Sequence, residues 1–413
     1  MSSTKLYPRT ALVLLTALNL LNYIDRSVLF AVQPLVQKEF HLTNIQLGYL
    51  TSAFLGFYMV AAPFTGPLAD RYSRKLIIVL GAVFWSGLTL LTAVTHTYVA
   101  LLVRHTLVGI GEATFVTIAP TFVADLYPEQ KRGRILGVFY LAIPVGTAAG
   151  YLLGGNLGVT YGWRFPFYVA AVPGFLLALA ILFIPEPKRG QFDSLEQTPE
   201  RSSLSGLATN PAFWTATLGM AMMTFALGGL QVWMPTFLSQ ARGYSLQSAN
   251  LVFGGIIVVD GTLASLAGGW LGDYLLRRNQ SAYYSVSAVS MALGVPLMIL
   301  ALFVRGPVML PAIAAAAFLL LFNTSPLNAA VINSVGATIR ATAIALNIFV
   351  IHLLGDVPSP TLMGYIADHR SLQLSFVAPV IAMVLSSAIL FYGMRFAPAV
   401  RIPDSGAAGA AAG

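Results

Sequence analysis

The sequence has no cysteine and few charged residues. Of its 413 residues, 9% are charged and 57% are hydrophobic. Soluble domains are about one quarter charged, so this chain cannot cover a water-facing surface. Without cysteine there are no disulfides and no thiolate metal sites, and the five histidines lack a metal-ligand spacing such as HExxH. We therefore expect an integral membrane protein with no metal site and no other cofactor.

Sequence signals of catalysis and of ion channels are also missing. No GxSxG, HExxH or paired-carboxylate motif lies at a membrane boundary, which argues against a membrane-embedded enzyme with catalytic residues. There is no repeated filter loop of the kind that channels require. The net charge of +8 would suggest a nucleic-acid partner in a soluble protein, but here the basic residues lie in short loops between apolar runs. We expect no nucleic-acid partner.

Twelve apolar runs of about 20 residues are each long enough to cross about 30 Å of hydrocarbon. The first is too long for a signal peptide and has no small-residue cleavage site, so we interpret it as a spanning helix. The runs lie near residues 10–36, 46–69, 75–96, 98–126, 134–157, 164–184, 211–239, 246–274, 281–304, 307–335, 340–367 and 374–396.

A polar stretch divides these runs into two sets of six. We predict an N-terminal six-helix bundle over 1–184, a cytoplasmic linker over 185–210, a C-terminal six-helix bundle over 211–400 and a disordered, Ala- and Gly-rich tail over 401–413. A weak repeat supports two related halves, because GPLADRYSRK (Gly66–Lys75) corresponds to GWLGDYLLRR, with Asp70 matching Asp273. The expected fold is an all-α membrane protein of two six-helix bundles related by a pseudo-two-fold axis, with a site between them.

The distribution of basic residues predicts the orientation. With both termini and the linker in the cytoplasm, sixteen Lys and Arg residues fall inside and five outside. This asymmetry follows the positive-inside rule and favours an even number of helices. Because the sequence has no cysteine and its loops are compact, we expect a multi-pass protein of a bacterial inner membrane.

Several motifs resemble those of the major facilitator superfamily. Residues Gly66–Lys75 are similar to its loop signature after helix 2, RHTLVGIGE (Arg104–Glu112) to its helix 4 signature, and PVGTAAGYLLGG (Pro144–Gly155) to its helix 5 motif. NYIDR (Asn22–Arg26), GEATFVTIAPTFVADLYP (Gly111–Pro128) and HLLGDVPSP (His352–Pro360) narrow the resemblance to the spinster family of lysolipid and sphingolipid transporters. The resemblance covers nearly the whole chain and implies a monomeric secondary transporter that works by alternating access.

The loop signature implies a gating latch made of Asp70, Arg71, Arg74 and Lys75. The Asp can sit at a neighbouring helix N-terminus while the cations form ion pairs within the half. A plain topology signal would explain the Arg and Lys residues, but not an Asp placed after spaced glycines.

Six charged residues lie well inside the predicted spans, away from their ends, where each costs about 2.5–3.5 kcal/mol if it faces lipid. They are Asp25, Arg26, Arg104, Glu112, Asp260 and Asp356. Asn22, Asp25 and Arg26 have i, i+3, i+4 spacing, so they share one polar helix face, which we expect to line a cavity. Asp260 is a departure from what we expect of the family, where a small or apolar residue would stand.

The resemblance implies that the helix 1 Asp and the helix 4 Arg approach each other. We predict that Asp25 and Glu112 couple transport to protons, with Asp25 as the carrier whose ionisation depends on Arg104. The alternative is a permanent ion pair, either Asp25 with Arg104 or Glu112 with Arg26, that only holds the half together.

We assign substrate binding to Asn22, Arg26, Arg104 and Asp356, since guanidinium groups recognise phosphate. His352 and Asp356 precede Pro358 and Pro360, which should break that helix. The expected substrate is an amphipathic lipid such as a lysophospholipid or a sphingosine-1-phosphate-like molecule, and its partners are protons and membrane lipids. A proton-coupled carrier of a soluble organic anion or of a drug is the alternative. Several large apolar side chains would either line a chamber for the lipid tail or serve ordinary packing. They are Met220, Met222, Met223, Phe225 and Trp233.

Overall fold

The structure is a computed structural model that describes residues 3–190, 204–336 and 339–398. Within these ranges the chain forms helices and no strand, and twelve segments are long and apolar enough to span a membrane. The predicted all-α fold with twelve spans is confirmed. The predicted tail, 401–413, and residues 191–203 of the predicted linker lie outside the described residues.

The first six spans use seven helices, because the fifth span is divided at Leu141. The helices are α1 (Ser3–Phe40), α2 (Asn44–Arg71), α3 (Arg74–Ala93), α4 (Tyr98–Ala124), α5 (Glu129–Tyr140), α6 (Ala142–Tyr161) and α7 (Phe165–Leu182). A short helix, α8 (Leu204–Ala208), precedes the second set.

The last six spans contain three interruptions inside predicted continuous runs, one of them at Phe376 of the twelfth span. The tenth span breaks after Leu321, and the eleventh contains a π-helical turn, η2. The elements are α9 (Pro211–Arg242), α10 (Leu246–Leu276), α11 (Ala282–Phe303), α12 (Met309–Leu321), α13 (Thr324–Asn333), α14 (Arg340–Ile351), η2 (His352–Asp356), α15 (Pro358–His369), α16 (Leu372–Ser375), α17 (Val377–Gly393) and η3 (Met394–Phe396).

Short polar residues set the helix starts. The hydroxyls of Thr43, Ser73 and Thr97 accept hydrogen bonds from backbone N–H groups in the first turns of α2, α3 and α4. Each cap satisfies a donor that has no partner within its own helix. Gly243 ends α9 with φ of 77°, a conformation that glycine adopts without strain.

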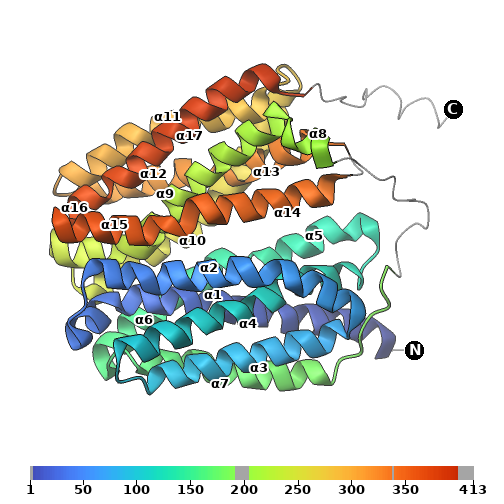
Figure 1. Ribbon diagram of the computed structural model, residues 1–413, viewed down its shortest axis with the longest axis horizontal. Coiled ribbons are helices and arrows are strands. Elements are labelled where there is room, and N and C mark those ends of the chain that lie inside the picture. The colour runs from blue at the N-terminus through green and yellow to red at the C-terminus, as the bar shows by residue number, and fades with distance from the viewer. Residues whose placement is uncertain (1–2, 191–203, 337–338, 399–413) are drawn as a thin grey trace.

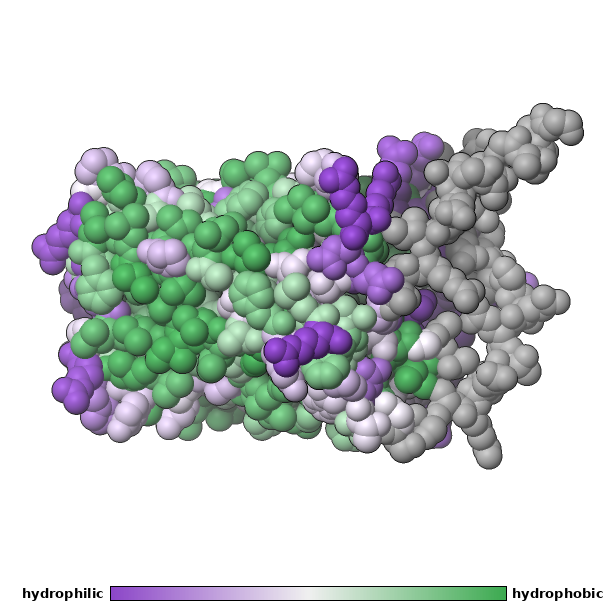
Figure 2. All heavy atoms as spheres, turned by 90° about the horizontal axis from the view of Figure 1, so that it is seen from above, coloured by the Kyte–Doolittle hydropathy of each residue, from purple (hydrophilic) through white to green (hydrophobic). Residues whose placement is uncertain are grey.

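The spans run side by side along the long axis, with α1–α7 in one layer and α9–α17 in the other (Figure 1). The described start of α1, α8 and η3 lie at the same end, which we call the linker end. The opposite end, with the α1–α2 and α15–α16 turns, is the far end. Apolar side chains cover the middle of the face in Figure 2, and hydrophilic ones gather toward the two ends, as expected for a protein surrounded by a bilayer.

Close helix packing depends on glycine where α6 crosses α1. A Cβ on Gly146 would lie 2.6 Å from the carbonyl oxygen of Leu20, and one on Gly150 would lie 2.6 Å from Cβ of Ser27. Small residues at such crossings let backbones approach in lipid, where the hydrophobic effect does not drive helix association.

Hydrogen bonds that join the two halves in the described part of the chain lie toward the far end. They connect α2 to α15, α1 to α9 and α10, and α6 to α9 and α10 through the pairs Asn44–Asp368, Ile45–Asp368, Ser52–Thr361, Gln37–Gln240, Ala31–Asn250, Tyr151–Gln231 and Asn156–Gln247. The two halves are therefore closed against each other at the far end.

Candidate functional site

The predicted polar face of α1 points in two directions. Asp25 faces α3, where Thr89 Oγ1 donates to Asp25 Oδ2 over 3.3 Å. Arg26 instead lies beside α2 and α4, since successive helical residues point about 100° apart. Asn22 is fully buried, and neither end of its amide has a hydrogen-bond partner in the described chain. The three residues therefore do not form one cavity wall.

Arg26 forms a buried ion pair with Glu112 of α4. Arg26 Nε lies 2.6 Å from Glu112 Oε2, and the exposed fractions of the two side chains are 15% and 0%. This pair is one of the two alternatives that the sequence left open. Arg26 Nη2 and Glu112 Oε1 have no hydrogen-bond partner among the described residues, so each group keeps binding capacity.

Three aromatic rings surround the Arg26 guanidinium. Its central carbon lies 5.1 Å from the ring centroids of Tyr23 and Phe54 and 4.8 Å from that of Tyr58. Such cation–π contacts stabilise a guanidinium that has lost water, each by about 0.5–2 kcal/mol. The rings therefore hold the charge in place inside the membrane span.

A cavity of about 100 Å³ lies between the two halves, beside Arg26. Its lining combines α1, α2 and α6 with α9 and η2, and includes Thr51, Thr147, Gln231 and Asp356. A cation from one half and a carboxylate from the other thus meet at one cavity.

Asp356 belongs to the π-helical turn and is bound to His352 of the same turn. His352 Nδ1 lies 2.9 Å from Asp356 Oδ1 and 3.0 Å from Oδ2. The ring of His352 also contacts Tyr58, with centroids 6.0 Å apart, which connects η2 to the aromatic rings around Arg26. The predicted interruption of this helix is confirmed, and π-turns of this kind are frequent at functional sites.

Arg104 does not join this cluster. Its Nη1 donates to the carbonyl oxygen of Leu91 over 2.5 Å and to Thr95 Oγ1 over 2.7 Å, and it does not line the cavity. The expected approach of Asp25 to Arg104 is wrong for this conformation, because the arginine binds the far end of α3 instead. Its neighbour His105 is buried and stacks on Phe54 at 5.0 Å.

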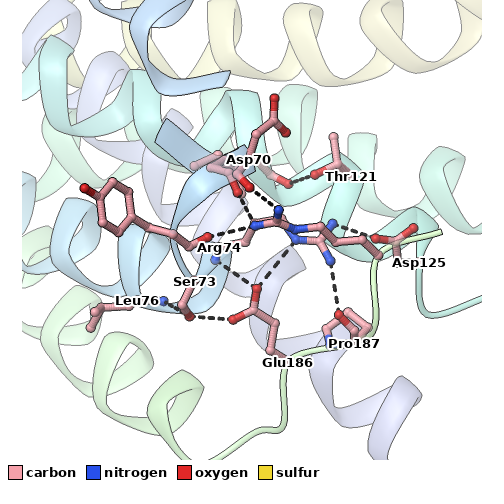
Figure 3. A network of polar contacts seen from close by, with 12 residues as sticks. Asp70, Ser73, Arg74, Leu76, Thr121, Asp125, Glu186 and Pro187 are labelled. Carbon is pink, nitrogen blue, oxygen red and sulfur yellow. Dashed lines mark hydrogen bonds and ion pairs between the residues drawn. The ribbon is translucent and has the colours of Figure 1, made fainter. Parts of the chain in front are cut away.

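A second polar cluster lies at the linker end and contains part of the predicted latch (Figure 3). The buried Arg74 lies 2.6 Å from Asp125 Oδ2 and donates to the carbonyl oxygen of Pro187, and its Nε lies 3.7 Å from Glu186 Oε1. Lys75 Nζ donates to the carbonyl oxygens of Leu182 and Ile184, 3.1 Å away in each case.

The other two latch residues behave differently. Asp70 and Arg71 are exposed, and in the described chain neither side chain forms a hydrogen bond or an ion pair. The backbone carbonyl of Asp70 accepts a bond from Arg189. The predicted placement of Asp70 at a neighbouring helix N-terminus is therefore not seen in this conformation.

Glu186 lies at the centre of this cluster, and the sequence did not reveal its role. Burial opposes its ionisation, but hydrogen bonds from the Ser73 hydroxyl and from backbone N–H groups at the start of α3 stabilise the carboxylate. Together with the Arg74 charge they lower the pKa of Glu186 below its ordinary value. The first residues after α7 are thus fixed to the start of α3.

Asp260 lies apart from both clusters, in α10. Its exposed fraction is 7%, and its Oδ2 has no hydrogen-bond partner in the described part of the chain. It lines a groove of about 430 Å³ beside Ala314 and Phe318 of α12. The residue that departs from the expected family pattern is thus a buried carboxyl without an ion pair.

Comparisons with known proteins agree with this architecture. The family model of the Major Facilitator Superfamily matches residues 15–357 of this chain. Protein spinster homolog 1 of Xenopus laevis is 35% identical over 390 residues, which cover 88% of this chain and 74% of that protein. The sphingosine-1-phosphate transporter SPNS2 of Danio rerio is 35% identical over 417 residues, which cover 95% and 82% of the two chains.

Solved structures show the same fold. A bacterial homologue of the human lysosomal transporter Spinster, in an inward-facing and unoccupied conformation, superposes with a TM-score of 0.88 at 24% identity, covering 95% of this chain and 98% of that one. A D-xylose–proton symporter superposes with a TM-score of 0.77 at 17% identity over 95% and 98% of the chains. With twelve spans in two halves, this chain belongs to the spinster family of the major facilitator superfamily and is a multi-pass secondary transporter.

Proposed function

We propose that the protein moves an amphipathic lipid with a phosphate-bearing head, such as a lysophospholipid or a sphingosine-1-phosphate-like molecule, by alternating access coupled to protons. The observation that carries this proposal is Arg26, which lines the cavity between the halves and keeps Nη2 without a hydrogen-bond partner in the described chain. Guanidinium groups bind phosphate oxygens through paired, charge-assisted hydrogen bonds. Relatives that are named sphingosine-1-phosphate transporters support the same class of substrate.

The cavity beside Arg26 is large enough for a phosphate group but too small for an acyl chain, because its volume is only about 100 Å³. We place the tail in an apolar groove of about 500 Å³ that borders the π-turn at Leu354 and is lined by Met222, Phe225 and residues of α15 and α17. Of the side chains considered for a tail chamber, Met220, Met223 and Trp233 are instead buried in the core.

For the proton, Glu112 is better placed than Asp25. A phosphate that binds Arg26 competes directly with the 2.6 Å contact between Arg26 and Glu112. The Glu112 carboxylate that loses its cation then has a higher affinity for a proton. Asp25 contacts Thr89 of α3 and does not line the cavity. Asp356, which His352 holds in place, lines the same cavity and would contact the remainder of the head group.

We place the linker end in the cytoplasm of a bacterial cell. Arg71, Arg74, Lys75 and Arg132 lie at this end, as the positive-inside rule requires of a cytoplasmic surface. The far end, where the halves are joined, then faces outward. In this placement the hydrogen bonds between the halves at the far end close the protein toward the outside.

Uptake of radiolabelled lysophospholipid into proteoliposomes, with and without a proton gradient, tests the proposal. We expect saturable flux that a proton gradient stimulates. Arg26→Gln should abolish this flux, and Glu112→Gln should leave a flux that the gradient no longer stimulates. Arg370→Gln, an exposed residue away from the cavity, is the charge-matched control. Lysolipid flux equal to that of empty liposomes under every gradient would refute the lipid assignment. Competition by small organic anions or drugs would then identify the alternative substrate.

A further inference from the structure

A second polar pocket lies at the far end of the C-terminal half, away from the cavity between the halves. It has a volume of about 520 Å³ and is lined by the end of α9, the following turn and the turn between α11 and α12. Arg242 and Arg305 supply its charge, and Tyr244, Pro307, Met309 and Leu310 supply an apolar wall. No acidic residue lines it.

The two arginines differ in how firmly they are held. Arg242 donates to the carbonyl oxygen of Leu302 and to Gln373 Oε1, and its guanidinium lies 4.6 Å from the ring centroid of Phe237. These contacts connect the end of α9 to the end of α11 and to α16, and they fix the charge in place. Arg305 is exposed, and in the described chain it forms neither a hydrogen bond nor an ion pair, so its side chain is free to close over a bound group.

The positive charge in this pocket is not neutralised by the protein. Within the described residues neither Arg242 nor Arg305 forms an ion pair, whereas Arg164, also at the far end, lies 2.7 Å from Glu39. Two cations that share one pocket repel each other, and an anion between them removes that cost. The positive-inside rule does not explain the pair, since it disfavours basic residues at the end opposite the linker.

We propose that Arg242 and Arg305 bind the phosphate of an anionic membrane phospholipid, which stays bound as a structural lipid and is not transported. Paired guanidinium groups match the oxygens of a phosphodiester through charge-assisted hydrogen bonds. The apolar wall of Met309 and Leu310, at the start of α12, suits the adjoining acyl chain, which free phosphate lacks. The site is independent of the proposed substrate, because none of its residues lines the central cavity.

Native mass spectrometry of the full-length protein, titrated with phosphatidylglycerol or with phosphatidylcholine of the same chain length, tests this proposal. We expect retention of phosphatidylglycerol about tenfold above phosphatidylcholine, because phosphatidylcholine carries a choline cation that the two arginines repel. We expect an approximately tenfold loss in Arg242→Gln and in Arg305→Gln, since one charged hydrogen bond to the phosphate is worth about that factor. Arg305→Gln removes no described contact, so its result does not depend on folding. Arg370→Gln, at the same end but outside the pocket, is expected to bind like the unmodified protein.

Three outcomes would overturn the assignment. Equal retention of the two lipids would show that the pocket does not distinguish lipids by the net charge of the head group. An equal loss in Arg370→Gln would show general electrostatic attraction to the surface. Displacement of phosphatidylglycerol by millimolar inorganic phosphate would assign the pocket to a free anion in place of a lipid. None of these results bears on transport, which the liposome assay measures separately.

Discussion

Asp368 of α15 binds Asn44 at the first turn of α2, and this contact joins the two halves at the far end. Asp368 Oδ1 accepts hydrogen bonds from the backbone N–H and from Nδ2 of Asn44, and its Oδ2 accepts one from the backbone N–H of Ile45, all at 2.8 Å. A carboxylate at a helix N-terminus satisfies orphan donors and faces the positive end of the helix dipole. One acidic side chain thus caps a helix of the opposite half.

Asp368→Asn is expected to open the far end. The substitution removes the charge and one acceptor, and hydrogen bonds to a charged group contribute about 1.5–3 kcal/mol each. The chain has no cysteine, so spin labels can be attached at Lys38→Cys and Arg370→Cys, both exposed, without background. Pulsed electron resonance should show a longer distance between the labels in Asp368→Asn.

Asn44→Ala is the graded control, because it removes the side-chain bond to Asp368, together with the bond that Asn44 accepts from Gln37, and keeps both backbone donors. It should lengthen the distance in a smaller fraction of molecules than Asp368→Asn does. Identical distance distributions in all three proteins would mean that other contacts keep the far end closed.

The Arg26–Glu112 pair is expected to show strong coupling in a double-mutant cycle. Removing one partner leaves a buried charge without compensation, which costs about 3–5 kcal/mol. Arg26→Met and Glu112→Gln should each lower the stability in detergent, and the double variant should lose less than the sum of the two. Thermal unfolding monitored by intrinsic fluorescence measures this. Additive losses would show that the two groups do not stabilise each other.

The helical period of α1 identified the right polar residues but not their separate partners. Asn22, Asp25 and Arg26 share a face within a 100°-wide stripe, yet Asp25 reaches α3 while Arg26 reaches α4. Which helix lies on each side of α1 depends on packing between segments far apart in the chain. Spacing along one helix carries no information about that packing.

Other site residues were hidden for the same reason. Asp368 contacts a residue 324 positions earlier in the sequence, and Glu186 one 112 positions earlier. In the sequence both look like ordinary loop charges. The π-turn before Pro358 was foreseen as an interruption, because proline restricts the backbone locally, whereas the extended reach of Arg104 to α3 was not.

The anchor formed by Glu186 is expected to depend on pH. Because its pKa in the folded protein is lowered, the stability it contributes is complete above the ordinary value of 4.5 and is lost as the pH falls through the lowered value. Glu186→Gln should therefore reduce stability by about 1 kcal/mol at neutral pH. In melting curves recorded from pH 7 to pH 3, the difference between the two proteins should disappear at the acidic end. A difference that stays constant with pH would assign the effect to packing.

Asp260→Asn is expected to stabilise the protein. A carboxyl on a membrane-spanning helix without an ion-pair partner costs about 2.5–3.5 kcal/mol on insertion scales, and the amide has the same shape without the charge. A gain of about 1–3 kcal/mol in detergent or lipid nanodiscs is the expected result, since part of the cost is already relieved in the folded protein. Asp273→Asn is the matched control in the same helix, because Asp273 Oδ1 accepts a 2.7 Å hydrogen bond from Tyr283, and a neutral amide oxygen in place of the charged acceptor should weaken this bond and destabilise the protein. A loss of stability in Asp260→Asn as large as that in Asp273→Asn would mean that the carboxyl of Asp260 binds a cation or a proton donor in the groove between α10 and α12.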